Sequence, residues 1–250
     1  MKKTRKKVFT FLQTESLEPA YLNLCLKTWE KNFSEDYEII PLSVQNLRNY
    51  ISEKNFKIVK NITPEVINYI KACVLYSNGG IFMDTDTLLL KEFYLPEEML
   101  DNYATVVFGN SPVSACLGFM MAQKGSIVLK EYITRLERVL LQQEQTSSNG
   151  NEIFNDMLSE GYNSKVLVID AESSGYLPEK ALYGVVGENL RAQLLFSSNV
   201  DAEDIYNNTK GIVSVHCKKI SEEYLNMDED EFLSQNTLLA QILNKCLNKN

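Results

Sequence analysis

Two aspartates, Asp84 and Asp86, stand two residues apart at the end of an apolar run that begins at Ile81. In a β-strand, residues i and i+2 point to the same face, so this spacing brings the two carboxylates together. Like charges this close are unfavourable unless a cation lies between them. Carboxylate oxygens suit Mg²⁺ or Mn²⁺, and these ions in turn bind diphosphates. The pair therefore predicts a divalent-metal site for a phosphate-bearing ligand.

The surroundings of this Asp-x-Asp motif distinguish it from a second one in the chain. Asp228 and Asp230 lie in an acidic stretch that is typical of a solvated helix start. Asp84 and Asp86 instead follow a predicted helix, a Gly-Gly turn and a buried strand. Because ligands of open α/β sheets bind at the carboxyl ends of the strands, the first motif is the candidate site.

The elements that must position these aspartates alternate between strands and helices in the first half of the chain. Thr63 is a good N-cap and Pro64 a good first helical residue, so a helix is expected from there to about Ser77. Further helices are expected from Pro19, over 44–51, 126–144, 152–158 and 229–248. Strands are expected over 8–12, 37–42, 81–83, 87–91, 105–108, 117–122, 166–169 and 211–215. This alternation predicts an α/β fold with a mostly parallel sheet flanked by helices and a C-terminal helical addition.

Size and charge narrow the possible partners. The 250 residues are 44% hydrophobic, enough for one domain with a full core. The net charge is −8, but five of the first seven residues are basic, so the remainder, 20 basic against 33 acidic residues, carries −13. An acidic body argues against nucleic acid as a partner. The basic tip, Lys2 to Lys7, suits peripheral contact with an anionic membrane surface, and equally a solvated terminus.

Cysteine usage and hydropathy favour a cytoplasmic protein. The apolar stretch after the basic tip is too short for a signal peptide, and no run approaches transmembrane length. The five cysteines, at positions 25, 73, 116, 217 and 246, are scattered and form no C-x-x-C pair. We therefore expect free thiols in a reducing compartment, at most at the inner face of a membrane.

Two quoted stretches resemble one known family. IKACVLYSNGGIFMDTDTLLLKEF, residues 70–93, is similar to the signature of DXD-containing sugar transferases, the group with capsular-polysaccharide glycosyltransferases and initiating mannosyltransferases. KVFTFLQTESLEPAYLNLCLKTWEKNFSEDYEIIPL, residues 7–42, resembles the opening strand, helix and strand of that group. The matching positions are Pro19, Cys25, Thr28, Trp29, Asp36, Tyr37 and Glu38. The resemblance implies a GT-A fold in a single domain, with a nucleotide-sugar-binding half over about 1–95 and an acceptor half over about 96–250.

The resemblance assigns roles to the acidic motif and to a late strand. It implies that Asp86 is the direct metal ligand and a catalytic residue, and that Asp84 contacts the ribose or the metal. His216, the one histidine, closes the predicted strand GIVSVH and is expected as a third metal ligand. Lys218 and Lys219 are then expected near the diphosphate of the donor. A solvated loop explains these lysines equally well.

Further donor-binding positions are implied where the chain matches the family or departs from it. Gly80 lies in the Gly-Gly turn, and Phe9 and Thr10 lie in the first strand, where relatives often carry His-Gln. Asn68 and Lys71 stand where relatives have Asp and Arg that contact the nucleotide and the sugar. Lysine keeps the positive charge but loses the guanidinium fork, so donor choice or activity is expected to differ. Alternatively, Lys71 only covers the helix surface.

The polar stretch SSNGNEIFNDML, residues 147–158, falls where relatives place a turn and helix near the donor sugar and acceptor. Asn151 is the donor-binding candidate there, and Glu152 the second catalytic candidate. An ordinary helix N-terminus with an acidic residue that favours the helix dipole explains them as well.

The resemblance, together with the metal-binding chemistry of the two aspartates, implies a glycosyltransferase that depends on Mn²⁺ or Mg²⁺. The resemblance implies transfer of a hexose or N-acetylhexosamine, with retention, from a nucleotide sugar, preferably UDP-linked, to a glycan or lipid-linked acceptor in surface-polysaccharide assembly. One alternative is a phosphatase of the haloacid-dehalogenase type, whose strand also ends in Asp-x-Asp. Another is a catalytically weak relative that binds nucleotide sugars.

Overall fold

The computed structural model divides the chain into two units that are interleaved along the sequence. It describes residues 5–12, 19–91, 98–142, 149–171, 174, 194–196, 202–203, 211–216 and 220–248. Unit 1 comprises Met1–Gln13, Glu38–Asp84 and Leu95–Asp170; unit 2 comprises Thr14–Tyr37, Thr85–Tyr94 and Ala171–Asn250. The acidic motif straddles this division, because Asp84 belongs to unit 1 and Asp86 to unit 2.

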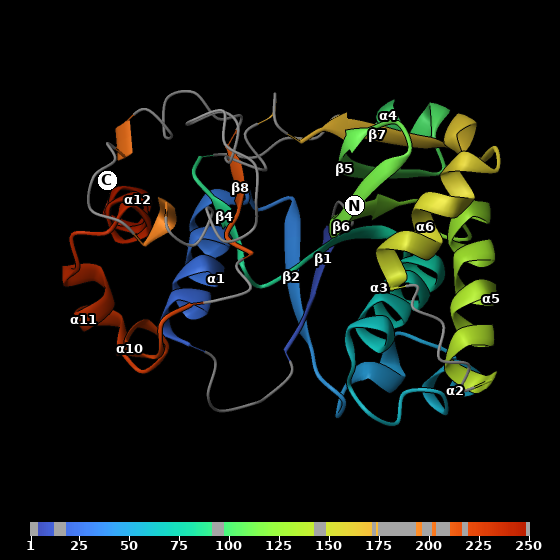
Figure 1. Cartoon of the computed structure of the whole chain (residues 1–250), viewed down its shortest axis with the longest axis horizontal. Helices are drawn as coiled ribbons and strands as arrows, with labels where there is room; N and C mark the ends of the chain where they lie inside the picture. The colour runs from blue at the N-terminus through green and yellow to red at the C-terminus, as the bar shows by residue number, and fades with distance from the viewer. Residues whose placement is uncertain are drawn as a thin grey trace. The chain divides into compact units, whose positions relative to one another are not determined.

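Unit 1 is built on a six-stranded sheet of order β2-β1-β3-β6-β5-β7 (Figure 1). The strands are β1 (Lys6–Phe11), β2 (Tyr37–Leu42), β3 (Gly80–Met83), β5 (Thr105–Ser111), β6 (Ser114–Ala122) and β7 (Val166–Asp170). β1 is parallel to β3 and β5 to β7, whereas β6 is antiparallel to both β3 and β5. A mostly parallel sheet in which β6 runs antiparallel to its neighbours confirms the fold class that the sequence predicted.

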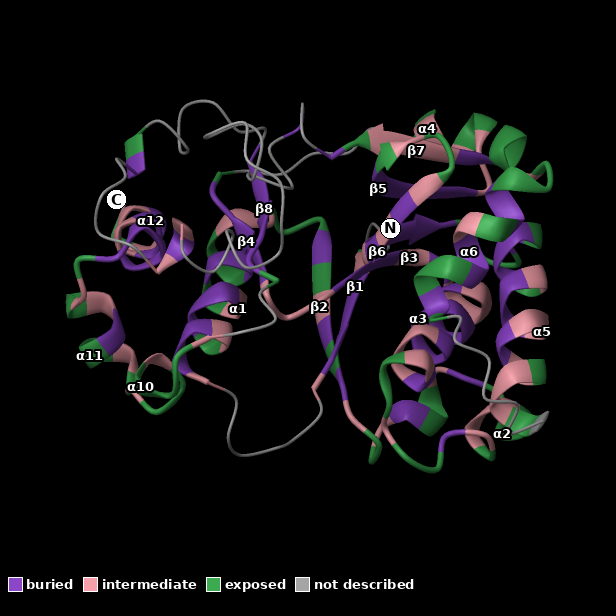
Figure 2. Cartoon of the chain, viewed as in Figure 1, coloured by how far each residue is buried: buried purple, intermediate pink, exposed green. Residues whose placement is uncertain are grey.

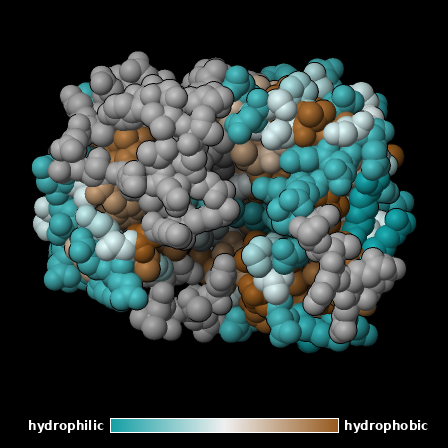
Figure 3. All heavy atoms as spheres, viewed as in Figure 1, coloured by the Kyte–Doolittle hydropathy of each residue, from teal (hydrophilic) through white to brown (hydrophobic). Residues whose placement is uncertain are grey.

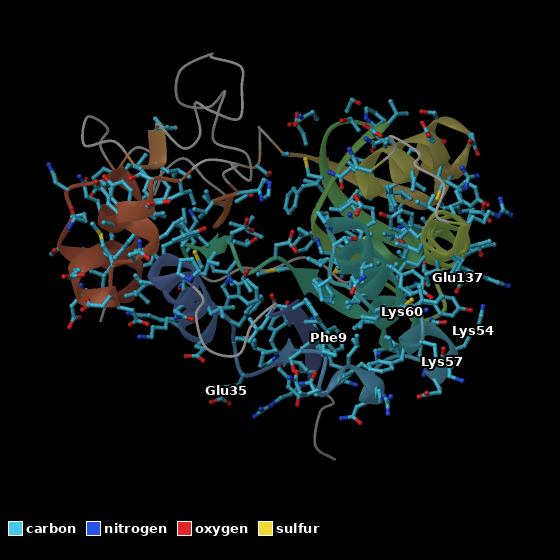
Figure 4. All side chains as sticks on the ribbon, turned by 60° about the horizontal axis from the view of Figure 1, so that its bottom comes forward. Phe9, Glu35, Lys54, Lys57, Lys60 and Glu137 are labelled. Carbon is cyan, nitrogen blue, oxygen red and sulfur yellow. The ribbon has the colours of Figure 1, made fainter. Side chains whose placement is uncertain are left out.

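Three helices of unit 1, α3 (Pro64–Asn78), α5 (Ile127–Gln142) and α6 (Gly150–Ser159), pack against one another and share one hydrophobic core with the sheet. The buried residues in Figure 2 concentrate on the strands and on the inner sides of these helices. Over α5 and α6 the surface in Figure 3 is largely hydrophilic. Figure 4 labels Lys54 of α2 (Glu53–Phe56) and Glu137 of α5, whose side chains form an ion pair of 3.1 Å. The short elements of unit 1 are η1 (Leu47–Asn49), α4 (Glu98–Asn102) and η2 (Tyr162–Lys165).

Helix α3 carries its own start and stop signals. The Thr63 hydroxyl accepts a hydrogen bond from the Val66 N–H, and Pro64 is the first helical residue, as the sequence predicted. The helix ends at Asn78, and the next residue, Gly79, caps it with a φ of 69° that favours glycine. Gly80 has φ 106°, and a Cβ there would lie 2.5 Å from the Lys7 carbonyl oxygen. Glycine therefore lets β3 begin directly beside the backbone of β1.

Unit 2 contains a two-stranded antiparallel sheet of β4 (Thr87–Leu89) and β8 (Ile212–Ser214). Its helices are α1 (Ala20–Asn32), α10 (Glu222–Leu225), α11 (Glu229–Ser234) and α12 (Leu238–Leu247). These elements share a second core, in which Leu88, Val213 and Phe232 are fully buried. The C-terminal helices confirm the predicted helical addition.

Two predicted helices differ in the structure. Over 44–51 only the short η1 forms, because the Asn46 side chain accepts from the Ser43 N–H at 2.9 Å and donates to the Pro41 carbonyl at 3.0 Å. Such side-chain bonds favour a turn over a helix. The helix expected over 229–248 is two helices, because the chain is extended at Gln235 and Thr237 caps a new start at α12.

Candidate functional site

Asp84 follows β3 and is fixed within unit 1. Its backbone N–H donates to the carbonyl of Gly118 at 2.8 Å, and Gly118 belongs to β6, the strand that pairs with β3. The Lys71 ammonium on α3 lies 2.7 Å from Asp84 Oδ1 and 2.9 Å from Oδ2, and it also donates to the Leu117 carbonyl at 3.0 Å. Three acceptors thus match the three N–H donors of an ammonium group.

The Lys71–Asp84 ion pair is buried on the lysine side. The Lys71 side chain is 5% exposed, whereas that of Asp84 is 32% exposed. A buried ammonium is stable only when it is paired and hydrogen-bonded, so Lys71 depends on Asp84. Lys71 therefore pairs with Asp84 inside unit 1 and does not cover the helix surface.

Asp86 and His216 form a second side-chain contact, within unit 2. The two residues come together because β4 and β8 pair in register, with Thr87 opposite Ser214. The Val215 N–H donates to the Asp86 carbonyl at 2.7 Å, and His216 Nδ1 lies 3.0 Å from Asp86 Oδ2. The ladder between an early and a late strand thus places the one histidine of the sequence beside the second aspartate.

The chemistry of the Asp86–His216 pair fits a divalent metal. A carboxylate oxygen with an imidazole nitrogen suits Mn²⁺, and Mg²⁺ also accepts the carboxylate. Within the described ranges no group of three or more His, Cys, Asp or Glu side chains could enclose an ion. Two protein ligands are nevertheless enough for an ion whose other positions are filled by substrate phosphates and water.

Cys25 of α1 lies near Asp86. The thiol is fully buried, and burial, with the nearby Asp86 charge and Cys246 adding to it, raises the pKa of Cys25 well above its usual value. A thiol in this setting stays protonated, so Cys25 acts as a core residue.

The predicted donor-binding residues of β1 and β3 lie in packed surroundings. Phe9, labelled in Figure 4, is fully buried in the core of unit 1 and packs edge-on against Tyr50 with ring centroids 5.6 Å apart. Thr10 is also fully buried, and within the described part of the chain its hydroxyl has no hydrogen-bond partner. Gly80 lies against the backbone of Lys7. Donor contacts at these positions stay predictions.

Three of the predicted residues lie at the start of α6: Asn151 and Glu152 of α6 itself, and Asn68 of α3. A Cβ on Gly150 would lie 2.4 Å from Asn68 Nδ2, so the amide of Asn68 lies directly against the first turn of α6. Tyr132 donates to the Gly150 carbonyl at 2.9 Å. Asn151 is exposed on this first turn, whereas Lys218 and Lys219 lie outside the described residues.

Glu152 belongs to a capping box. Its carboxylate accepts from the Asn149 N–H at 2.9 Å, and the Asn149 side chain accepts from the Glu152 N–H at 3.1 Å. This arrangement supports the helix-start interpretation of Glu152, because both side chains satisfy backbone donors that the helix leaves unpaired.

Replacing Glu152 separates capping from catalysis. Glutamine keeps an acceptor for the Asn149 N–H, so Glu152→Gln is expected to keep the free energy of unfolding within about 0.5 kcal/mol, whereas Glu152→Ala should lose about 1 kcal/mol. Urea unfolding measures both values. A capping role leaves the sugar-transfer rate of Glu152→Gln near that of the wild type, and a loss of 100-fold or about that order would instead make Glu152 catalytic.

Comparison with known proteins agrees with the fold. Residues 13–106 match the family described as glycosyltransferase sugar-binding region containing DXD motif. The structure is similar to a glycosyltransferase involved in the glycosylation of the major capsid of PBCV-1, with TM-score 0.51 and 10% identity over 88% of this chain and 98% of that chain. It is also similar to the glycosyltransferase GlyE of Streptococcus pneumoniae TIGR4, with TM-score 0.50 and 11% identity over 97% of this chain and 63% of that chain. A search of curated proteins finds no match.

The fold is that of glycosyltransferases of the GT-A type, as the resemblance implied. The family match contains the motif of Asp84 and Asp86, and together with the fold it supports a glycosyltransferase. This family implies a nucleotide-sugar donor and a glycan acceptor, and enzymes with the DXD region generally depend on a divalent metal. The same evidence favours the transferase over the phosphatase alternative.

Proposed function

We propose that this chain transfers a hexose or N-acetylhexosamine from a UDP-linked donor, with retention, to a glycan or lipid-linked acceptor in surface-polysaccharide assembly. The contact of 3.0 Å between Asp86 and His216 carries the metal-dependent part of the proposal. It joins the motif to a late strand that is 130 residues away in the sequence.

In this proposal, different residues bind the metal ion and the hydroxyl groups of the donor. Asp86 and His216 would hold Mn²⁺ or Mg²⁺, and the bound ion would offset the charge that develops on the departing diphosphate. Asp84, fixed at both carboxylate oxygens by Lys71, would accept hydrogen bonds from donor hydroxyl groups. Asn151 at the start of α6 and the lysines at 218 and 219 complete the proposed donor contacts.

Calorimetry with UDP and GDP, each with and without Mn²⁺, tests this proposal. Wild-type protein is expected to bind UDP in the presence of Mn²⁺, and Asp86→Ala should weaken that binding at least about tenfold because the carboxylate ligand is lost. Asp228→Ala, in the solvated Asp-x-Asp, is the matched control and should bind like the wild type. Undiminished Mn²⁺-dependent UDP affinity in Asp86→Ala would contradict the site.

Two contacts favour a catalytically weak nucleotide-sugar-binding protein as the second candidate. The Lys71 ammonium donates to both carboxylate oxygens of Asp84 and to the Leu117 carbonyl, and the Asn68 amide lies against Gly150. Side chains that already hydrogen-bond or pack within the protein have fewer groups available to contact the reacting sugar. Comparing UDP-sugar binding with UDP-sugar hydrolysis distinguishes the candidates, because a weak relative binds the donor without consuming it.

We further propose that the chain works in the cytoplasm, with its basic N-terminal residues at the inner face of a membrane. The setting is supported by the charge contrast between this tip and the acidic remainder. None of the helices in the described segments is long and apolar enough to cross a bilayer.

A further inference from the structure

Strand β4 has two edges, and among the described residues only one of them, the edge facing β8, pairs with a strand. Its hydrogen bonds to β8 are flanked by those from Val215 N to Asp86 O and from Leu90 N to Gly211 O. Polar groups of successive residues alternate between the two edges of a strand, so those of Thr87 and Leu89 face away from β8. Unpaired backbone groups in a buried strand are costly, and they need partners from elsewhere.

Helix α1 supplies these partners through three side chains of one helix face. Trp29 Nε1 donates to the Thr87 carbonyl at 2.6 Å, and Asn32 Nδ2 donates to the Leu89 carbonyl at 2.8 Å. The Thr28 hydroxyl accepts from the Leu89 N–H at 3.0 Å. Residues 28, 29 and 32 thus take the place of a third strand.

This contact is buried and lies one residue from the candidate metal ligand. Thr28 and Trp29 are fully buried, and the Thr28 hydroxyl is itself oriented by donating to the Cys25 carbonyl at 2.6 Å. Thr87, which Trp29 holds, follows Asp86 directly in the chain. On the edge of β4 that faces β8, the Asp86 carbonyl accepts a hydrogen bond from the Val215 N–H.

We propose that Thr28, Trp29 and Asn32 are positioning residues that fix β4 from α1 and thereby set the geometry of the Asp86–His216 pair for a divalent cation. This inference rests on the proposed function, because it concerns the same pair. Without these side chains the backbone of β4 would keep its hydrogen bonds to β8 but lose those to α1, and the Asp86 carboxylate would sample more orientations. The expected consequence is weaker metal binding, since residues behind a ligand set its orientation.

Mn²⁺ titration in the presence of UDP, followed by calorimetry and by electron paramagnetic resonance, tests the inference. Thr28→Val keeps the shape but loses the hydroxyl, and Trp29→Phe keeps an aromatic ring but loses the N–H. Each is expected to weaken Mn²⁺ binding about tenfold. Thr28→Ser keeps the hydroxyl and should bind within about twofold of the wild type, which is the conservative rescue.

Thr237→Ala controls for stability. Thr237 caps α12 in the same unit by accepting from the Ala240 N–H, so its loss destabilises the fold and removes none of the three hydrogen bonds from α1 to β4. All titrations are made at a temperature at which circular dichroism shows every variant folded. Equal Mn²⁺ affinity in folded Thr28→Val and wild type would overturn the inference, and so would an equal loss in Thr237→Ala. Absence of Mn²⁺-dependent UDP binding in the wild type would overturn the proposed function and this inference together.

Discussion

Gly80→Ala is expected to lower the free energy of unfolding by about 3 kcal/mol. A side chain at φ 106° is strained, which costs roughly 1–2 kcal/mol, and the new Cβ would lie 2.5 Å from the Lys7 carbonyl, so β1 and β3 must move apart. Neither strand can move freely, because Phe9 of β1 and Phe82 of β3 are both buried in the same core. Urea unfolding measures the loss.

Gly125→Ala is the matched control for this prediction. Gly125 also has a positive φ, 78°, but a Cβ there would meet nothing within 4 Å. It should lose only the backbone cost of about 1 kcal/mol. The difference between the two variants isolates the close approach of β3 to β1, and equal losses would show that this approach adjusts at no cost.

Lys71→Met is expected to lower the free energy of unfolding by about 2–3 kcal/mol and to weaken UDP binding. Removing one partner of a buried ion pair costs roughly 3–5 kcal/mol, and the 32% exposure of the Asp84 side chain reduces that value. Methionine keeps most of the packing of the lysine stem, so the loss reports the charge. Chemical denaturation and UDP calorimetry, each at constant ionic strength, measure the two effects.

A double-mutant cycle with Asp84→Asn distinguishes pairing from packing. Asp84→Asn alone leaves the buried Lys71 ammonium without its counter-charge and is expected to be as destabilising as Lys71→Met. The double variant removes both charges, so its loss should fall short of the sum of the single losses by about 2 kcal/mol. Additive losses would mean that the two side chains contribute independently of each other.

The predicted fold follows the sequence most closely where local chemistry is decisive. Helix α3 begins at Thr63 and Pro64 and ends before Gly79, as its capping residues indicate. The stretch over 44–51 looked equally helical, but the Asn46 side chain holds a turn there, and hydrophobic periodicity does not report that competition. Strands β3 and β4, on either side of the motif, belong to different sheets, and pairing of this kind depends on distant segments.

The sequence predicts where the candidate site lies in the chain better than it predicts the contacts that its residues make. The resemblance implies that Asp86 and His216 share a metal, and in the structure their side chains are in contact, whereas metal binding by the pair stays a prediction. The ion pair of Lys71 with Asp84 was not predicted. The Lys71 ammonium also donates to the Leu117 carbonyl, and a sequence does not show which backbone carbonyls a side chain will reach. Thr28 and Asn32 carried a weak signal, as polar residues on the same helix face as Trp29.

The side chains of α1 along β4 also bear on the colloidal behaviour of the protein. An open strand edge invites other chains to add to it, and this is a common start of aggregation and domain swapping. Here Trp29, Thr28 and Asn32 occupy the carbonyls of Thr87 and Leu89 and the Leu89 N–H, groups that an incoming strand would need. The β4 edge of this two-stranded sheet, which by itself is too small to be stable, is thereby covered against strand addition.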